Sequence, residues 1–287
     1  MKVKVLLTGS KGQLGQCVKD LSEEYSSIDF VFADRETLDI TNQEQVDRIF
    51  QKENFDYCIN CAAYTAVDQA EEEQDKAFDI NANGPKNLGL VCKRYGVVLI
   101  HISTDFVFDG TKKEPYTEED TPNPISVYGA SKLQGEIEIQ KDLERYFIIR
   151  TSWLYSEHGN NFMKTMLRLA KTRDEISVVK DQIGTPTYAG DLAQVILKII
   201  SDKSDNFGLY HYSNEGSISW YDFAKAIFKE SKINIKVNPI TTEAYSALAR
   251  RPAYSVLNKQ KVKYNLGVMT SDWKESLKKA VYAFVSK

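Results

Sequence analysis

The sequence predicts an α/β fold, in which a doubly wound parallel sheet is followed by a smaller, mixed C-terminal part. Short apolar runs alternate with amphipathic stretches of helical length through the first 150 residues. About five of these runs are hydrophobic on both faces, as expected for strands that helices cover on both sides. Such alternation implies right-handed crossovers between parallel strands. With 287 residues, 42% of them hydrophobic, the chain can bury one large core or two smaller ones.

The elements expected in the first part follow one another in a regular order. Thr41 is a suitable N-cap for the second helix, since Glu44 follows at the spacing of a capping box. A helix over 128–141 and a sixth strand over 146–150 close this part. The earlier strands are predicted over residues 3–7, 30–33, 57–61 and 97–102, with helices over 14–24, 42–51 and 75–95 between them.

Beyond residue 150 the alternation continues, but its pieces are shorter and less regular. No internal repeat or low-complexity linker separates the two parts, so we expect 1–150 and 151–287 to pack closely, with interleaving allowed. The predicted helices of the second part cover 161–171, 190–201, 220–230, 242–248 and 272–285, and its predicted strands cover 176–179 and 208–212.

Overall charge and hydropathy exclude several function classes. The formal net charge of -3 and the pI near 5.8 argue against a protein built to hold nucleic acid. The sequence contains no run of about 18 apolar residues, the length that would span a membrane. Its N-terminal apolar run is shorter than the roughly 7–15 residues of a secretory signal. We therefore expect a cytoplasmic protein with no nucleic-acid or membrane partner.

Charge is divided unevenly between the two parts. Residues 1–150 carry 17 Lys+Arg against 27 Asp+Glu, whereas residues 151–287 carry 20 against 13, so the balances are -10 and +7. Complementary, solvated surfaces explain this asymmetry. A basic C-terminal part would also help to hold an anionic substrate such as a nucleotide diphosphate. Both interpretations stay open.

The cysteines do not predict a disulfide or metal framework. Four of them, Cys17, Cys58, Cys61 and Cys92, are scattered through the first part. Cys58 and Cys61 have the spacing of half a metal clip, but no second pair accompanies them and no histidine lies close in sequence. We therefore expect core thiols and no bound metal.

A glycine-rich turn joins the first strand to the first helix. Gly9, Gly12 and Gly15 fall as G-x-x-G-x-x-G, and glycines there allow a tight turn and close backbone approach to a pyrophosphate. The helix N-terminus offers unpaired N–H groups and a partial positive charge to the phosphates. The alternative is a turn that serves packing alone. We predict a dinucleotide site in residues 1–150, and hence a Rossmann arrangement.

Residues after the second strand bear on the choice of dinucleotide. Asp34 follows that strand and can accept hydrogen bonds from a ribose 2′-hydroxyl, which favours NADH. Arg35 could instead meet a 2′-phosphate, so NADPH stays open as well. Asp39 and Ile40 follow shortly afterwards and could flank the adenine.

A tyrosine and a lysine are spaced for joint acid–base work. Tyr128 and Lys132 stand at i and i+4, which places both on one face of one helix. A free tyrosine has a pKa of about 10, and an adjacent ammonium lowers it by stabilising the phenolate. Ser103 and Thr104 end the strand over 97–102, at the edge where doubly wound sheets bind ligands. A lone Y-x-x-x-K is commonly a surface pair, but this combination predicts a catalytic site.

Together these motifs resemble the extended short-chain dehydrogenase/reductases, and within them most closely the dTDP-4-dehydrorhamnose reductases. The resemblance runs essentially from end to end, and several of its segments are specific to this group of reductases. The segments that carry it are Gly12 to Gly15, Asn60 to Glu71, Ser103 to Gly110, Tyr128 to Lys132, Arg150 to Tyr155, Gly159 to Phe162, Asp181 to Thr187 and Arg251-Pro252.

The resemblance implies that NADH or NADPH reduces the C4 ketone of dTDP-4-dehydro-L-rhamnose, a dTDP-linked 4-keto-6-deoxy sugar. It implies that Tyr128 donates the proton, that Lys132 tunes the pKa of Tyr128 and holds a ribose, and that Thr104 assists them. Residues implied to contact the substrate are Thr104, Asp105, Trp153, Asn161 and Arg251. Residues implied to contact the cofactor, besides Tyr128 and Lys132, are Gly9, Gly12, Gln13, Leu14, Gly15, Asp34, Asp39, Ile40, Ala62, Ala63, Tyr64 and Ile102. We expect a monomer or a homodimer.

Related activities set the alternatives. Dehydratases of the same superfamily need an Asp-Glu pair after the threonine, but Phe106 follows Asp105 here and cannot move a proton. Phe106 also replaces the commoner Tyr of the reductases, which removes one hydroxyl. An epimerase or reductase of another nucleotide keto-sugar stays open. So does a non-catalytic NADP-binding subunit resembling that of methionine adenosyltransferase, although such proteins carry Ser-Asn in place of Thr104-Asp105.

Three smaller motifs each have a structural interpretation. Asn161 precedes a helix and either caps it or faces a diphosphate. Arg251 stands at a helix stop before Pro252 and could also pair bidentately with phosphate. Trp220 begins an amphipathic helix, where we expect it to anchor packing.

Overall fold

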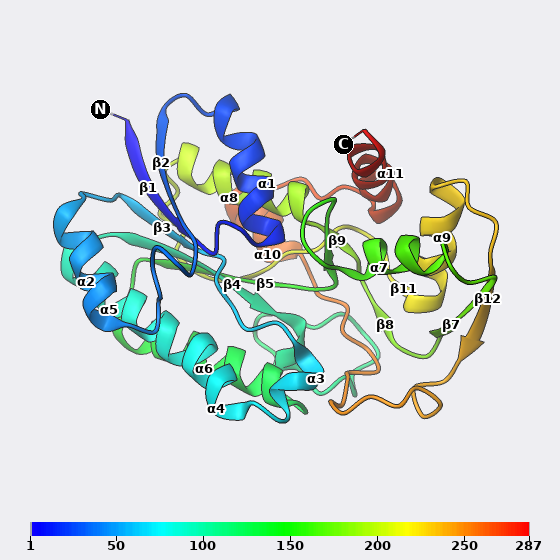
Figure 1. The fold of residues 1–287 in the computed structure, drawn as a ribbon. Coiled ribbons are helices and arrows are strands. Elements are labelled where there is room, and N and C mark those ends of the chain that lie inside the picture. The colour runs from blue at the N-terminus through cyan, green and yellow to red at the C-terminus, as the bar shows by residue number, and fades with distance from the viewer. Residues whose placement is uncertain (1, 287) are drawn as a thin grey trace.

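A six-stranded parallel sheet lies at the centre of the molecule, with helices on both of its faces (Figure 1). The computed structural model describes residues 2–286. The strand order is β10-β5-β4-β3-β1-β2, and every neighbouring pair runs parallel, which confirms the predicted doubly wound fold. The strands are β1 (Val3–Thr8), β2 (Ile28–Ala33), β3 (Tyr57–Asn60), β4 (Val98–Thr104), β5 (Tyr146–Thr151) and β10 (Gly208–His211).

The sixth strand of the sheet comes from the second part of the chain. The sequence predicts the strand over 146–150 as the sixth, but this strand is the fifth, β5, and β10 pairs with its outer edge. The chain therefore leaves the sheet after Thr151 and returns to it near Gly208. As a result, Arg150 of β5 lies directly beside His211 of β10.

Two hydrophobic cores lie on opposite faces of the sheet. Along β1, Val5 and Leu7 point into one core and Leu6 into the other, because successive strand side chains alternate between faces. This burial on both sides explains why the strands carry apolar residues on both of their faces. The first core is covered by α1 (Gln13–Leu21), α8 (Ala189–Ser201) and α10 (Gln260–Leu266), and the second by α2 (Gln43–Lys52), α5 (Gly84–Tyr95) and α6 (Val127–Asp142).

A third core holds together the smaller layer on the right of Figure 1. It forms between helices α7, α9 and α11 and a parallel pair of strands, β7 and β12. Within residues 2–286, every helix is too short or too polar to cross a bilayer. The elements are α7 (Phe162–Leu169), α9 (Trp220–Glu230), α11 (Trp273–Val285), β7 (Glu175–Val179) and β12 (Lys236–Ile240).

Short elements connect these layers. Strand β6 pairs with β9, and β8 pairs with β11; each of these strands is two residues long. The helix predicted over 75–95 is interrupted by one π-helical turn at Asp79–Asn83. The remaining elements are α3 (Val67–Ala70), α4 (Gln74–Phe78), β6 (Leu154–Tyr155), β8 (Ile183–Gly184), β9 (Thr187–Tyr188), β11 (Ile218–Ser219) and the single 3₁₀ turns Ser22–Glu24 and Asp105–Val107.

The cap predicted for α2 is wrong by one residue. Asn42, and not Thr41, is the N-cap, and its side-chain oxygen accepts a hydrogen bond from the Gln45 backbone N–H. Thr41 is engaged elsewhere, because its hydroxyl and its N–H both donate to Asp39. Asparagine is as good an N-cap as serine or threonine, so the sequence alone could not separate the two registers.

The helix predicted over 242–248 is also wrong, because this stretch forms only turns. Thr242 is held by Asp181, which accepts hydrogen bonds from the Thr242 N–H and hydroxyl. Farther along, the Ala249 N–H donates to Asp68 instead of to a carbonyl one helical turn earlier. Asp181 and Asp68 thus tie the two ends of this stretch to distant segments. Helices α3 and α10 and strand β12 were not predicted from the sequence.

Helix α6 is fixed to the sheet by an ion pair that water cannot reach. Glu136 accepts three hydrogen bonds from the Arg150 guanidinium, at 2.7–3.2 Å, and a fourth from the Ser103 hydroxyl. The two charged side chains are 1% and 3% exposed. A Cβ at Gly129 would clash with the Phe106 carbonyl oxygen, so the helix also approaches neighbouring backbone very closely.

Removing one partner of this ion pair should strongly destabilise the fold. In Glu136→Gln the Arg150 guanidinium stays buried without a counter-charge, which costs about 3–5 kcal/mol. Urea unfolding followed by circular dichroism measures the loss. The matched control is Glu175→Gln, which breaks an exposed pair with Lys236 and should have a much smaller effect. Equal shifts in the two variants would contradict this account of α6.

Candidate active site

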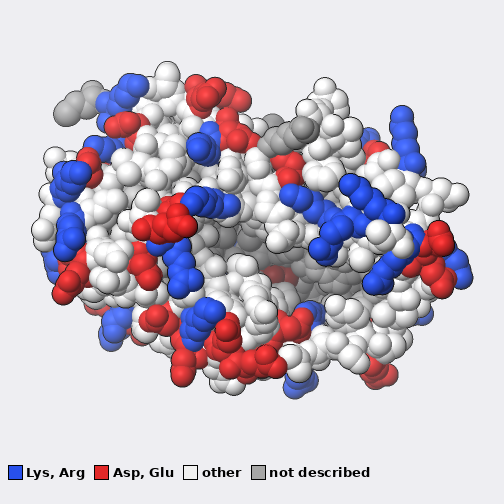
Figure 2. Space-filling view, viewed as in Figure 1, with Lys and Arg blue, Asp and Glu red and all other residues white. Residues whose placement is uncertain are grey.

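Three neighbouring cavities form one trough along the carboxyl ends of the parallel strands. Their volumes are about 530, 650 and 700 Å³. The first two share Gly12, Cys61, Ala63 and Thr65 in their walls. Figure 2 shows the hollow between the sheet layer and the C-terminal layer, with Lys and Arg side chains gathered along its upper right rim. The residues that the second and third cavities share are Phe106, Trp153, Phe162, Trp220 and Arg251.

The glycine turn is shaped by close backbone contacts. Gly9 has φ +69°, and a Cβ there would lie 2.6 Å from the Ala62 nitrogen. A Cβ on Gly15 would lie 2.5 Å from the Gly9 carbonyl oxygen, so Gly15 serves helix–loop packing and does not line the trough. Gly12 is the N-cap of α1 and has no side chain to bond the first N–H groups of the helix. Those N–H groups and the space above them suit a pyrophosphate.

The 530 Å³ cavity gathers the residues predicted for the adenosine half of the cofactor. Asp34 lies at its rim, where the Lys11 ammonium contacts the carboxylate at 2.5 Å. Lys11 first and then Thr37 lower the pKa of Asp34 to about 2, so this carboxylate is ionised at neutral pH. The other predicted residues in its wall are Gly9, Gly12, Asp39, Ile40, Ala62, Ala63 and Tyr64.

Tyr128 lies in the wall of the 650 Å³ cavity, with the Thr104 hydroxyl beside it. Burial raises the pKa of Tyr128 to about 12, and the Thr104 hydroxyl offsets this only in part. The phenol is therefore protonated at neutral pH, as a proton donor must be. Phe106 packs edge-on against the Tyr128 ring at 5.5 Å, so no hydroxyl from that side meets the phenol.

Lys132 is 2% exposed and lies deeper than Tyr128. Its Nζ donates a 2.6 Å hydrogen bond to the Ile102 carbonyl and lies 3.3 Å from His101 Nε2. Burial lowers the pKa of Lys132 to about 8. The tuning of the Tyr128 pKa by Lys132 stays a prediction.

Asp105 contributes a carboxyl group with one unpaired, buried oxygen to the wall of the same cavity. Its side chain is 2% exposed, and Oδ2 has no hydrogen-bond partner in the protein. Burial raises the pKa of Asp105 to about 6, opposed by the nearby Ser255 and Thr104 hydroxyls. The Thr151 hydroxyl, also in this wall, is buried without a partner too. Two orphaned polar groups suit a ligand rich in hydroxyls, such as a sugar.

An aromatic wall closes the far side of the cavity. The rings of Trp153 and Trp220 stack with centroids 3.6 Å apart and an interplanar angle of 9°, and Phe162 packs against Trp220. Trp153 adopts a positive φ of 47°, and a Cβ on Gly184 would lie 2.5 Å from its ring. Trp220 thus lines the site as well as anchoring packing. The sequence gives no signal for this, because only the fold brings Trp220 of α9 against Trp153, which lies between β5 and β6.

Two residues predicted to bind substrate are held by protein partners. Arg251 forms two hydrogen bonds with the Asp68 carboxylate, at 2.7 and 3.1 Å, where the second and third cavities meet. Asn161 caps α7, since its oxygen accepts from the Lys164 N–H and its amide donates to the Ser156 carbonyl. Asn161 lines the cavity, but its polar atoms are used within the loop.

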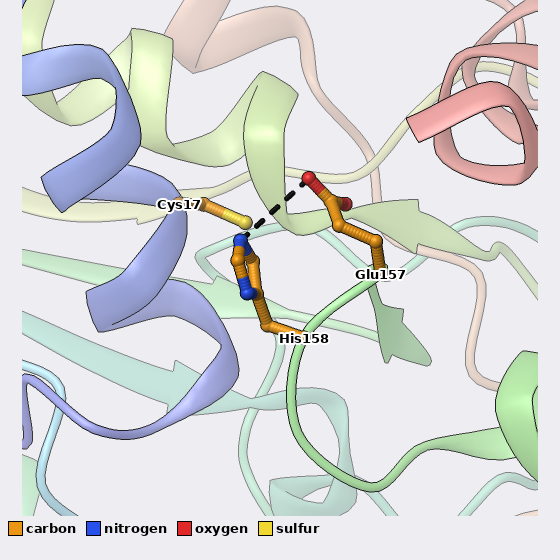
Figure 3. A group of neighbouring side chains, drawn as sticks. All are labelled: Cys17, Glu157 and His158. Carbon is orange, nitrogen blue, oxygen red and sulfur yellow. Dashed lines mark ion pairs between the residues drawn. The ribbon is translucent and has the colours of Figure 1, made fainter. Parts of the chain in front are cut away.

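A group of polar side chains holds the loop between β6 and α7, residues 156–161, against α1. Figure 3 shows Cys17 of α1 pointing toward Glu157 and His158 of the loop. Their ligand atoms lie within 4.8 Å of one another, and among residues 2–286 no other Cys, His, Asp or Glu group is spaced so that it could hold a metal ion. His158 already pairs with Asp20 at 2.7 Å, and Glu157 accepts from the Tyr188 hydroxyl. These contacts keep the loop over Gln13, which donates to the Leu154 carbonyl.

Comparison with known proteins agrees with this geometry. Residues 3–286 match the family described as the RmlD substrate binding domain. The dTDP-4-dehydrorhamnose reductase of Aggregatibacter actinomycetemcomitans is 44% identical over 96% of this chain and 97% of its own. A solved dTDP-4-dehydrorhamnose reductase of Clostridium acetobutylicum superposes with a TM-score of 0.95 at 46% identity, covering 99% of this chain and 100% of that one. The Bacillus anthracis enzyme, solved in complex with NADP, gives 0.94 at 45% identity, with 100% of both chains covered. The chain belongs to the dTDP-4-dehydrorhamnose reductase family of extended short-chain dehydrogenase/reductases.

Proposed function

We propose that the protein reduces the C4 ketone of dTDP-4-dehydro-L-rhamnose to dTDP-L-rhamnose, with NADH or NADPH as the reductant. The observation that carries this proposal is the meeting of a protonated Tyr128, Thr104 and the carboxyl group of Asp105 in the wall of the 650 Å³ cavity. Family membership supports the substrate, and the NADP complex of the Bacillus anthracis relative supports the cofactor. We also propose a cytoplasmic monomer or homodimer.

The cofactor would lie along the trough from Asp34 to Lys132. The N–H groups at the start of α1 would hold its pyrophosphate, while the ionised Asp34 would accept from a ribose hydroxyl. A bound reduced nicotinamide would supply the hydride. The carbonyl oxygen of the sugar would then lie beside Tyr128, whose O–H gives its proton to the developing alkoxide. Thr104, whose hydroxyl donates to Asp105 Oδ1 at 3.1 Å, would redirect that hydrogen to the same alkoxide oxygen.

The substrate would extend from this point into the 700 Å³ cavity. The sugar would lie against Trp153, and its hydroxyls would donate to the unpaired Asp105 oxygen. The third cavity, lined by apolar side chains together with polar ones that include Arg173, Glu175 and Gln182, would receive the nucleotide. Arg251 stands between the two and would exchange Asp68 for the diphosphate. Residues beyond 150 would thus supply most of the substrate contacts.

Tyr128→Phe tests the proton donor. The variant keeps the ring but lacks the O–H, so kcat should fall about 10²–10⁴-fold while cofactor affinity changes little. The measurement is the loss of reduced-nicotinamide absorbance with enzymatically prepared dTDP-4-dehydro-L-rhamnose. Tyr282→Phe, at an exposed position on α11, is the matched control. Unchanged kcat in Tyr128→Phe would remove the assigned donor, and cofactor binding without any wild-type turnover would favour another keto-sugar or a non-catalytic role.

Asp34→Asn tests the choice between the two dinucleotides. The ionised carboxylate repels a 2′-phosphate, and two like charges about 6 Å apart at an effective dielectric constant of about 40 change affinity roughly tenfold. The ratio of NADPH to NADH affinity should therefore rise about tenfold in the variant, as fluorescence titration would measure. Lys11→Ala should move the ratio the other way, since it removes a cation from the same rim. A ratio unaffected by either change would place the 2′ position elsewhere.

Asp105 should make kcat/KM fall at acidic pH, which gives the pH profile an acidic limb. Its ionised carboxylate accepts a stronger, charge-assisted hydrogen bond from a sugar hydroxyl than the protonated carboxyl does, and its pKa is raised to about 6. As the pH falls through about 6 the carboxyl gains a proton and this hydrogen bond weakens, so kcat/KM should fall about tenfold to a lower plateau. Asp105→Asn should have a lower kcat/KM near neutrality and should lack this limb. A limb that persists unchanged in the variant would belong to another group.

A further inference from the structure

His101 lies directly beneath the proposed site, and none of the steps above uses it. The side chain is 0% exposed, on the strand β4 that ends at Thr104. Its Nδ1 lies 3.0 Å from Asn60 Nδ2, and its Nε2 lies 3.3 Å from Lys132 Nζ. The imidazole therefore joins the strand β3 to the lysine of α6.

The orientation of the Asn60 amide is fixed by a backbone group. Its oxygen accepts from the Ala62 N–H at 3.1 Å and from the Thr8 hydroxyl at 2.7 Å. A rotated amide would set its NH₂ against the Ala62 N–H, donor against donor. The NH₂ of Asn60 must therefore face His101.

This orientation selects one tautomer of His101. Because Asn60 donates to Nδ1, that nitrogen must carry a lone pair, and the hydrogen of the neutral ring sits on Nε2. A doubly protonated ring would put a hydrogen against the Asn60 NH₂. Burial acts in the same direction and holds the pKa of His101 well below its usual range.

The selected tautomer presents a donor to Lys132. An ammonium has no lone pair, so Nε2–H and a charged Lys132 would meet donor to donor at 3.3 Å. A neutral amine resolves the conflict, since it accepts from His101 and still donates to the Ile102 carbonyl at 2.6 Å. Both contacts of Lys132 are then ordinary hydrogen bonds.

The other ionisable groups around Lys132 do not reverse this preference. Glu136, one turn along α6, favours the ammonium, but its carboxylate is already paired with Arg150. Burial raises the pKa of the Cys61 thiol to about 12, so this neighbour stays uncharged. Tyr128 is protonated as well. The charge on Lys132 is opposed by burial and by His101 alike.

We propose that His101 is a positioning residue that stabilises the neutral amine of Lys132 in the ligand-free protein, so that filling the dinucleotide site draws a proton onto Lys132. A pyrophosphate brings negative charge, and ribose hydroxyl oxygens accept from an ammonium, so the bound state favours the charged form. The coupling to a dinucleotide rests on the proposed function, whereas the tautomer of His101 does not.

The tautomer can be observed without any ligand. Long-range ¹H–¹⁵N spectra of the imidazoles distinguish Nε2–H from Nδ1–H rings, and the chain has only three histidines. The signals lost in His101→Phe assign His101. We expect an Nε2–H ring that does not titrate between about pH 5.5 and 9. An Nδ1–H ring, or protonation near the ordinary histidine pKa of about 6.5, would overturn the proposal.

The coupling can be measured as proton uptake. Titration of NADPH in buffers of different ionisation enthalpy gives the number of protons bound, which should rise toward one as the pH increases through about 8. His101→Phe removes the Nε2–H donor and should move this rise upward by about one pH unit, the effect of one hydrogen bond on a protonation equilibrium. An unshifted profile, or no uptake in the wild type, would overturn the coupling.

Two variants of the Asn60 group separate the proposed role from general damage. Asn60→Asp replaces the NH₂ by an acceptor, so His101 should change to the Nδ1–H tautomer and the rise in uptake should move to higher pH. Thr8→Val removes one partner of the Asn60 oxygen but leaves the Ala62 N–H, so tautomer and profile should stay as in the wild type. Equal behaviour of the two variants would contradict the proposal. Failure of NADPH to bind any of these proteins would overturn the proposed function and its coupling, even with the expected tautomer.

Discussion

The buried ion pair between Glu136 and Arg150 fixes where α6 lies, and the site depends on that position. Tyr128 and Lys132 stand on this helix, whereas Thr104, Asp105 and the Ile102 carbonyl come from β4 and the turn after it. A shift of the helix by about one ångström would separate the phenol from its hydroxyl neighbour, which can cost on the order of 10² in rate. Gly129 also lets the helix lie close against the Phe106 carbonyl group, which helps to fix its position.

Burial determines the protonation state of the groups that would move protons. It raises the pKa values of Tyr128 and Asp105 and lowers those of Lys132 and His101, in each case because low-dielectric surroundings disfavour charge. Asp34, at the open rim, is shifted the opposite way by its pairing with Lys11. The trough thus has an ion pair at its open rim and buried ionisable groups with shifted pKa values at its inner end.

The local patterns predicted the sheet and most of the proposed cofactor site. Hydrophobic runs locate strands, and the glycine turn and the Tyr–Lys spacing carry their meaning within a few residues. The aromatic wall could not be predicted in this way, because Trp153 and Trp220 are 67 positions apart and meet only through packing. The pairing of Arg251 with Asp68 and the proposed role of His101 also arise from contacts between distant segments, so local patterns do not predict them. The turns over 242–248 show the converse, since a locally favoured helix does not form where Asp181 and Asp68, from distant segments, hold the two ends of the stretch.

The most direct test of the account follows the hydride itself. Nicotinamide cofactor that carries deuterium at its reactive carbon would be incubated with the protein and dTDP-4-dehydro-L-rhamnose, and the product analysed by mass spectrometry and NMR. The proposed hydride transfer would place one deuterium at C4 of the dTDP-L-rhamnose formed. A product without deuterium, or no product from protein that binds the cofactor, would contradict it.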